Sequence, residues 1–130
     1  MRNSQKELFK KAMISNKKKG NLGEFIASVY LRFKGYEILK RNYFIKGGEI
    51  DIVARKKDII AIVEVKTRTN DKYGSPKDAV NYYKQKHLGF AAKCFLKYHN
   101  LENVKVSFDV IEVNLKPFKI NHIEHAFEIS

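Results

Sequence analysis

The chain has 130 residues, of which 26 are Lys or Arg and 14 are Asp or Glu, so its formal net charge is +12. This length predicts a single domain, and a hydrophobic content of 44% excludes a wholly disordered protein. The one cysteine, Cys94, excludes an internal disulfide framework and a thiolate zinc site, and no apolar run is long enough to span a membrane.

The N-terminal third is predicted to contain a basic arm, a helix and a strand. Residues 1–19 are rich in lysine, so we expect a flexible arm ahead of one domain at residues 20–130. Apolar residues at helical spacing predict an amphipathic helix at residues 22–34, and Gly35 is a suitable end for it. A strand is expected at residues 36–45.

A β-hairpin is expected next, because two apolar segments, residues 48–54 and 59–67, flank a polar connection at residues 55–58. Alternation places the charged side chains of both segments on one face and near the strand ends, with Ile50 and Ile52 on the opposite face. The charged set comprises Glu49, Asp51, Glu64 and Lys66.

Two registers of this hairpin remain open. A turn at Lys56-Lys57 places Glu49 opposite Glu64, whereas a turn at Lys57-Asp58 places Asp51 opposite Glu64. Burying charge is costly unless a metal or a reaction uses it, and clustered carboxylates repel one another when nothing neutralises them. The cluster therefore indicates a site for a divalent cation; a salt-bridged strand end that faces solvent is the structural alternative.

The C-terminal half is predicted to hold one long helix and one strand. Residues 73–76 break the chain, a helix is expected from Lys77 to about Tyr98, and a strand at residues 104–114 returns to the same sheet by a crossover. The tail at residues 120–129 is given no assignment. Helix, three strands, helix and strand predict an α/β fold. The inward stripe of the long helix is expected to comprise Val80, Tyr83, Phe90, Ala91, Cys94, Phe95 and Tyr98, with the lysines on other faces.

Asp51, followed after twelve intervening residues by Glu64-Val65-Lys66, resembles the PD-(D/E)xK signature of restriction-endonuclease-like nucleases, with Ile50 in place of the proline. A longer ordered set resembles the YraN-type family of small bacterial proteins over residues 18–127. This resemblance implies a restriction-endonuclease-like mixed β-sheet flanked by helices, and nuclease activity. The set consists of Gly20-Asn21-Leu22-Gly23-Glu24, Gly35-Tyr36, Arg41-Asn42, Gly48-Glu49-Ile50-Asp51, Glu64-Val65-Lys66-Thr67-Arg68, Lys84 and Phe108-Asp109-Val110.

The same resemblance implies a catalytic site for Mg²⁺ or Mn²⁺. Asp51, Glu64 and the backbone carbonyl of Val65 would bind the ion, which would polarise the scissile phosphate. Lys66 would orient or deprotonate the attacking water, or neutralise charge on the phosphate, because burial and a nearby metal can depress the pKa of a lysine.

Five other residues could belong either to the site or to the fold alone. Glu24 is either a further catalytic acid or the partner of Asn21 in a helix capping box. Glu49 is interpreted as part of the site, either as a ligand or as an acid paired beside it. Asp109 is expected to be a structural hydrogen-bonding partner. The His122-x-x-His125 pair lacks a third ligand and is also expected to be structural.

The excess positive charge favours a nucleic-acid partner over an anionic membrane, although solubility alone explains basicity about as well. The resulting hypothesis is a cytoplasmic, metal-dependent endonuclease acting on DNA rather than RNA, with branched or structured DNA as the narrower expectation. The alternative is a nucleic-acid-binding module with a nuclease fold and little or no turnover. A homodimer is compatible with this size. The expected phosphate contacts, each with a solvated surface as the competing explanation, are Arg68, Lys84, Gln85, Lys86, Lys17, Lys18 and Lys19.

Overall fold

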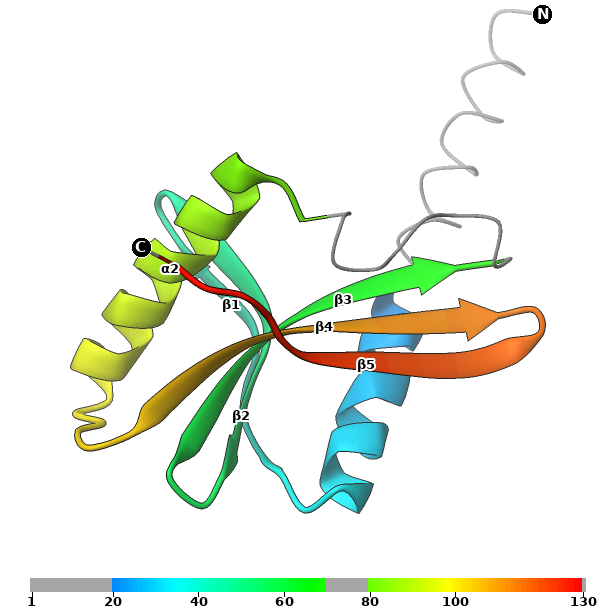
Figure 1. Ribbon diagram of the computed structural model, residues 1–130, viewed down its shortest axis with the longest axis horizontal. Helices are drawn as coiled ribbons and strands as arrows, with labels where there is room; N and C mark the ends of the chain where they lie inside the picture. Colours follow the sequence, from blue (N-terminus) through cyan, green and yellow to red (C-terminus); the bar gives the residue numbers. More distant parts are fainter. Residues whose placement is uncertain (1–19, 70–79, 130) are drawn as a thin grey trace, which may run out of the picture.

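The computed structural model describes residues 20–69 and 80–129. The arm expected at residues 1–19 and the break expected at residues 73–76 lie outside the described residues. A helix at residues 20–33, called the N-terminal helix below, precedes five strands and a second helix (Figure 1). These elements are β1 (Glu37–Ile45), β2 (Gly48–Lys56), β3 (Ile59–Arg68), α2 (Tyr82–Tyr98), β4 (Lys105–Leu115) and β5 (Phe118–Phe127).

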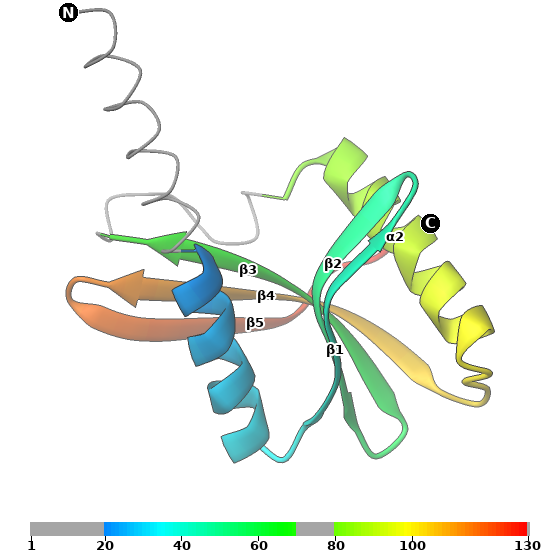
Figure 2. The same cartoon turned by 180° about the vertical axis from the view of Figure 1, so that it is seen from behind.

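The strands form one mixed sheet in the order β1-β2-β3-β4-β5. Neighbouring strands are antiparallel except β3 and β4, which are parallel because α2 provides the crossover between them. The two helices lie on opposite faces of the strongly twisted sheet (Figures 1 and 2). The predicted α/β fold is therefore confirmed, and β5, which the sequence left without an assignment, adds an edge strand.

Strand β3 is the centre of the fold because alternate side chains supply two separate cores. Ile60 and Ile62 pack beneath α2 against Phe95, and all three are almost fully buried. Ala61 and Val63 point the other way and pack against the N-terminal helix. Burying side chains of this size stabilises the fold by about 1.5–3 kcal/mol each. A strand covered on both faces also explains why the only polar groups of β3 lie near its end.

The predicted inward stripe of α2 is confirmed at Phe95 but wrong at its other three aromatic positions. Tyr83 is 74% exposed, Phe90 is 51% exposed and Tyr98 is 83% exposed. Cys94, expected to be a buried thiol, is only partly buried. The side chains of α2 that do face the core are mostly small: Leu88, Gly89, Ala91, Ala92 and Phe95.

Small residues are required on this face because α2 lies very close to β2. A Cβ atom at Gly48 would lie 2.7 Å from the carbonyl oxygen of His87 and 3.0 Å from Cβ of Ala91. The predicted start of α2 at Lys77 is also wrong, because Asn81 is in an extended conformation and caps the helix. Its Oδ1 accepts a hydrogen bond from the backbone N–H of Lys84 at 2.9 Å.

The β2–β3 hairpin adopts the register with its turn at Lys57-Asp58, since Lys56 pairs with Ile59. Lys57 takes the positive φ of 57° that tight hairpin turns favour. The expectation that Ile50 and Ile52 share a face is wrong: Ile50 packs in the core under α2, and Ile52 packs under the N-terminal helix. Regular alternation thus breaks at Asp51, the residue between them.

Candidate active site

The candidate site lies where the β2–β3 ladder stops. Backbone pairing of these strands runs from Lys56 and Ile59 to Ile52 and Val63. Beyond this point the backbone N–H of Val65, two residues after Val63, donates to the Oδ2 atom of Asp51 at 2.8 Å. The carboxylate of Asp51 thus accepts the hydrogen bond of a β3 N–H group in place of a backbone carbonyl. This contact explains why the side chains of β2 stop alternating between the two faces at Asp51.

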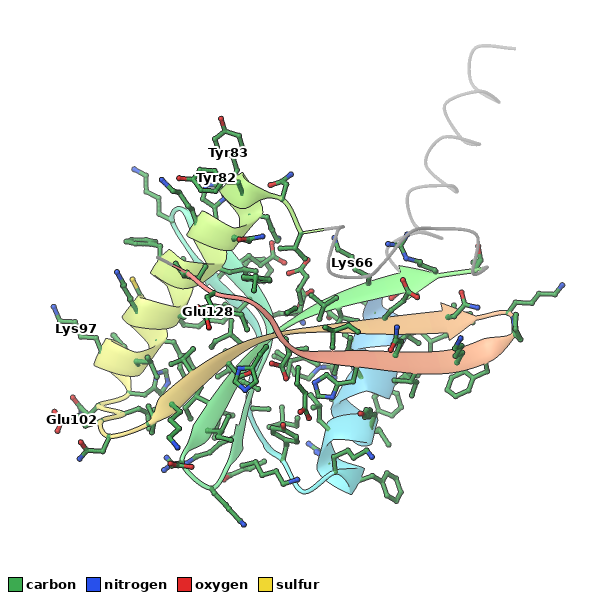
Figure 3. The ribbon with its side chains drawn as sticks, viewed as in Figure 1. Lys66, Tyr82, Tyr83, Lys97, Glu102 and Glu128 are labelled. Atoms are coloured by element: carbon green, nitrogen blue, oxygen red, sulfur yellow. The ribbon has the colours of Figure 1, made fainter. Side chains whose placement is uncertain are left out.

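An open pocket of about 400 Å³ lies at this end of the sheet. In Figure 3, Lys66 projects from β3 on the side that faces the N-terminal end of α2. The structure therefore gathers all five residues that the sequence analysis placed in catalysis, and their roles stay predictions. The lining residues are Gly20, Glu24, Glu49, Asp51, Glu64, Val65, Lys66, Thr67 and Lys84.

The two central acids are buried even though the pocket is open. Asp51 is 8% exposed and Glu64 is 5% exposed. Burial raises the pKa of Asp51, and the hydrogen bond from Val65 opposes that rise. Burial, followed by the negative charge of Asp51, raises the pKa of Glu64 to about 7, although Lys84 and Lys66 act in the opposite direction. Ionising both Asp51 and Glu64 therefore costs free energy, and a bound cation would remove that cost.

Two amines approach one oxygen of Glu64 and leave the other without a partner. Nζ of Lys66 lies 3.6 Å from Oε1 of Glu64, and Nζ of Lys84 lies 3.7 Å from the same atom. Oε2 of Glu64 is buried and accepts no hydrogen bond from any residue in the described part of the chain. A buried carboxylate oxygen without a partner is unusual in a folded protein and indicates an atom ready to coordinate a ligand.

The N-terminal helix reaches the pocket because Gly23 has no side chain. A Cβ atom at this position would lie 1.8 Å from Oγ1 of Thr67 and 2.9 Å from its Cβ. The close approach brings Glu24, the next residue, beside Asp51. Burial and then the charge of Asp51 raise the pKa of Glu24. The helix already includes Asn21, so the capping-box alternative for Glu24 is wrong.

Asn42 on β1 is a residue of the site that the sequence analysis missed. With its amide oriented to suit both groups, its nitrogen donates to both carboxylate oxygens of Glu24, at 3.2 and 3.1 Å. Asn42 has a positive φ of 54°, a conformation that asparagine tolerates better than most residues. In the sequence analysis Asn42 appears only within the Arg41-Asn42 motif of the family resemblance, and no role in the site was assigned to it.

The donor atoms fit a cation that is shared with a substrate. Among residues 20–69 and 80–129, no three His, Cys, Asp or Glu side chains meet closely enough to hold an ion by themselves. The protein offers instead the carboxylates of Asp51 and Glu64, which line one pocket together with Val65. Mg²⁺ is commonly held by one or two carboxylates together with waters and phosphate oxygens, so the set suits such an ion.

The expected phosphate contacts do not all gather at the pocket. Lys84 lines it. Gln85 and Lys86 instead line a small separate pocket next to Glu128. Arg68 forms an ion pair with Glu112, with 2.6 Å between Nε and Oε2. Nucleic-acid binding by these residues stays a prediction. The remaining three contacts, Lys17, Lys18 and Lys19, lie outside the described residues.

Asp109 is a structural hydrogen-bonding residue, as predicted. It is 1% exposed, accepts from the hydroxyl of Ser107 and bonds Nε2 of His122 at 2.7 Å. Nδ1 of His122 in turn lies 3.1 Å from the hydroxyl of Tyr30, so the chain of contacts ties β4 and β5 to the N-terminal helix. The histidine is structural, as expected, but it is buried rather than on the surface.

Comparison with known proteins identifies the family to which the chain belongs. The sequence matches the family described as "Uncharacterised protein family UPF0102" over residues 23–113. The chain belongs to the UPF0102 family. It is 46% identical over 114 residues to a UPF0102 protein of Clostridioides difficile, covering 88% of this chain and 100% of that protein. It is 47% identical over 116 residues to one of Alkaliphilus oremlandii, covering 86% and 99%.

These matches confirm the family that the ordered motifs predicted. A third UPF0102 protein, from Caldanaerobacter subterraneus, is 42% identical over 119 residues, with 88% of this chain and 98% of that protein covered. Within the described part of this UPF0102 protein, neither helix has the length and apolar character needed to cross a membrane.

Proposed function

We propose that this UPF0102 protein is a metal-dependent endonuclease that hydrolyses phosphodiester bonds in DNA. The observation that carries the proposal is the buried pair Asp51 and Glu64, 8% and 5% exposed, beside Lys66 in an open pocket. If the salt bridge had only a structural role at a strand end, its acids would be exposed to water, where their charge costs little free energy. Here the acids are buried, and one carboxylate oxygen has no partner in the described chain.

The restriction-endonuclease-like fold is part of the same proposal. A mixed sheet with a helix on each face carries Asp51 on β2 and the Glu64-Val65-Lys66 sequence on the neighbouring β3, and these residues line one pocket. The signature noted in the sequence needs that arrangement, because its acids come from separate strands and must converge on one ion. The fold therefore supports the proposal, and the UPF0102 family name itself carries no activity.

In the proposed mechanism Asp51, Glu64 and the carbonyl of Val65 hold the ion. A bound Mg²⁺ or Mn²⁺ ion supplies a Lewis acid for the phosphate and lowers the pKa of a bound water. Lys66 lies 3.6 Å from Glu64, where its amine can orient that water and offset charge that develops on the phosphate.

Two further groups position the substrate in this mechanism. Lys84 approaches from α2 and can bind a neighbouring phosphate oxygen, because its side chain keeps about a third of its surface exposed. Glu24, which accepts hydrogen bonds from Asn42 and lies beside Asp51, could accept a hydrogen bond from the attacking water. Catalysis of this kind depends mainly on positioning and on electrostatic stabilisation, so these few groups suffice.

The test is cleavage of linear duplex, single-stranded and junction DNA, and of RNA, with Mg²⁺, with Mn²⁺ or with a chelator. Asp51→Asn and Lys66→Ala should each lower the metal-dependent rate by about 100-fold or more. Matched controls are Asp58→Asn and Lys105→Ala, which change an exposed acid and amine that pair with each other at 3.9 Å, and these should keep full activity.

Circular dichroism and thermal melting establish that each variant is folded. Cleavage that survives Asp51→Asn would refute the proposal. A wild-type protein that binds DNA but yields no product with either metal would instead favour the alternative function, a binding module with a nuclease fold, which the net charge of +12 also supports.

A further inference from the structure

The solvent-facing side of α2 combines aromatic rings with lysines. Successive helical residues are turned by about 100°, and on this basis six residues fall within an arc of about 100° opposite the buried face. All six residues are exposed to solvent, which agrees with that placement. We call this surface the α2 outer face; it consists of Tyr82, Tyr83, Lys86, Phe90, Lys93 and Lys97.

The rings on this face are strongly exposed although apolar surface is costly in water. Tyr82 is 61% exposed, Tyr83 is 74% exposed and Phe90 is 51% exposed. The rings of Tyr82 and Tyr83 meet edge to face with centroids 5.9 Å apart, and Nζ of Lys86 lies 4.7 Å from the Tyr82 centroid. Gathered exposed rings of this kind mark a surface that contacts a partner.

The charge of the face points to a polyanion as that partner. Its three lysines lie between the rings around the helix, and α2 contains no aspartate or glutamate at any of its 17 positions. A helix that lies in a membrane surface needs a continuous apolar face with its basic residues to the side. The interleaving found here instead matches the surfaces that bind single-stranded nucleic acid, where rings stack on bases and amines contact phosphates.

The α2 outer face starts at the end of α2 that lies nearest the candidate active site (Figure 3). Lys84, in the first turn of the same helix, places its Nζ 3.7 Å from Glu64 in the pocket. In Figure 3, Tyr82 and Tyr83 lie at the end of α2 nearest Lys66, and Lys97 lies at the far end. The face spans sixteen residues, and their fifteen steps of 1.5 Å amount to about 22 Å, which corresponds to roughly six nucleotides at 3.4 Å each.

A pocket with further aromatic residues lies near the far end of α2. It has a volume of about 490 Å³ and is lined by Lys40, Tyr43, Ile45, Cys94, Tyr98 and His99. Aromatic residues together with a lysine suit a flat base that carries a phosphate.

We propose that the α2 outer face binds an unpaired stretch of nucleic acid that extends from the active-site pocket, with bases stacked on its rings and phosphates on its lysines. The inference rests on the proposed function and deepens it, because it assigns a substrate with a single-stranded segment. An intact duplex hides the faces of its bases and can use only the lysines.

The test measures binding of a labelled 12-nucleotide single strand and of a 12-base-pair duplex by fluorescence anisotropy, with chelator present so that nothing is cut. Tyr83→Leu keeps an apolar side chain but removes the ring, and it should weaken single-strand binding by roughly 5- to 150-fold with little change for the duplex. Tyr83→Phe keeps the ring and should bind like the wild type.

Salt dependence separates the lysines from the rings. Lys93→Ala with Lys97→Ala should lower the slope of log affinity against log salt for the single strand by about 0.7 per lysine, while Tyr83→Leu should leave that slope unchanged. Matched controls lie elsewhere on the surface: Phe33→Leu removes a ring that is 88% exposed, and Lys119→Ala removes an exposed amine from β5. Both controls should bind as the wild type does.

Two results would overturn the inference. One is equal loss of single-strand and duplex binding in Tyr83→Leu, or no loss at all. The other is binding to anionic phosphatidylserine vesicles that Tyr83→Leu preserves and Tyr83→Ala abolishes while single-strand affinity stays constant, which would assign the face to a membrane surface. Because binding is measured without metal, a wild type that holds single strands through these rings but cuts nothing would refute the nuclease and leave this surface standing.

Discussion

Glu64→Gln should remove a pH-dependent cost from the metal-free protein. Burial and the adjacent Asp51 raise the pKa of Glu64 from 4.5 to about 7 in the folded state. Between these two values the folded protein holds a proton that the unfolded chain has released. Stability should therefore fall as the pH rises through this window, by about 1.4 kcal/mol per pH unit at most. Above pH 7 the full cost is present, and below pH 4.5 it is absent.

The size of the effect follows from the shift. A rise from 4.5 to about 7 corresponds to at most about 3 kcal/mol of folding free energy at pH 8. Gln cannot ionise, so the variant should be more stable than the wild type at pH 8 by up to that amount. For a chain of 130 residues this corresponds to a melting temperature higher by roughly 10 °C. Near pH 4.5 the two proteins should have similar stability.

The measurement is urea unfolding of both proteins in chelator at several pH values from 5 to 8. The difference between variant and wild type isolates this one residue from the other groups that titrate. Glu102→Gln, at an exposed position in the segment before β4, is the matched control. Its free energy of unfolding should change with pH in the same way as that of the wild type. A difference between Glu64→Gln and wild type that stays constant with pH would refute the claim that burial holds a proton on this carboxyl.

Three more outcomes are expected. Adding Mg²⁺ at pH 8 should raise the melting temperature of the wild type in proportion to the logarithm of its concentration, and the same Gln variant should lose that response. Gly23→Ala should destabilise the fold by about 1–3 kcal/mol and abolish cleavage, since its Cβ would meet Thr67 at 1.8 Å, whereas Gly20→Ala meets nothing within 4 Å and should be silent in melting experiments. Asp109→Ala should cost about 3 kcal/mol in urea unfolding, because it leaves the buried His122 without its acceptor.

The hydrophobic pattern was enough to predict the central elements. Two-residue alternation located β2 and β3 and placed their charged groups at one end, because a strand covered on both faces can carry charge only where it emerges. Pattern alone did not select the turn at Lys57-Asp58, since both registers put the charges on the same face. Nor did it predict the loss of alternation at Asp51, which depends on a carboxylate replacing a backbone acceptor for Val65.

The errors on α2 have a different physical cause. Helical periodicity assigns large apolar residues to the core, and it therefore placed Tyr83, Phe90 and Tyr98 inward. These three rings are exposed because α2 packs close to β2. The short distance between the two elements depends on Gly48, a residue of β2, and so cannot be predicted from the sequence of α2 alone. Strand β5 was missed because it is an edge strand whose partly buried and exposed residues do not alternate, so its sequence carries no strand pattern.

Close packing of α2 also links the active site to the surface of the helix. Lys84 reaches within 3.7 Å of Glu64 because the small residues beneath α2 let the helix lie against β2. The inner face of α2 is filled by small residues together with Leu88 and Phe95, and Tyr82, Tyr83 and Phe90 point into solvent. The packing of α2 on β2 thus places an amine near the carboxylates and leaves exposed rings on the outer side of the helix. A side chain introduced at Gly48 would push the helix outward and should weaken Lys84-dependent catalysis without removing any ring from the α2 outer face.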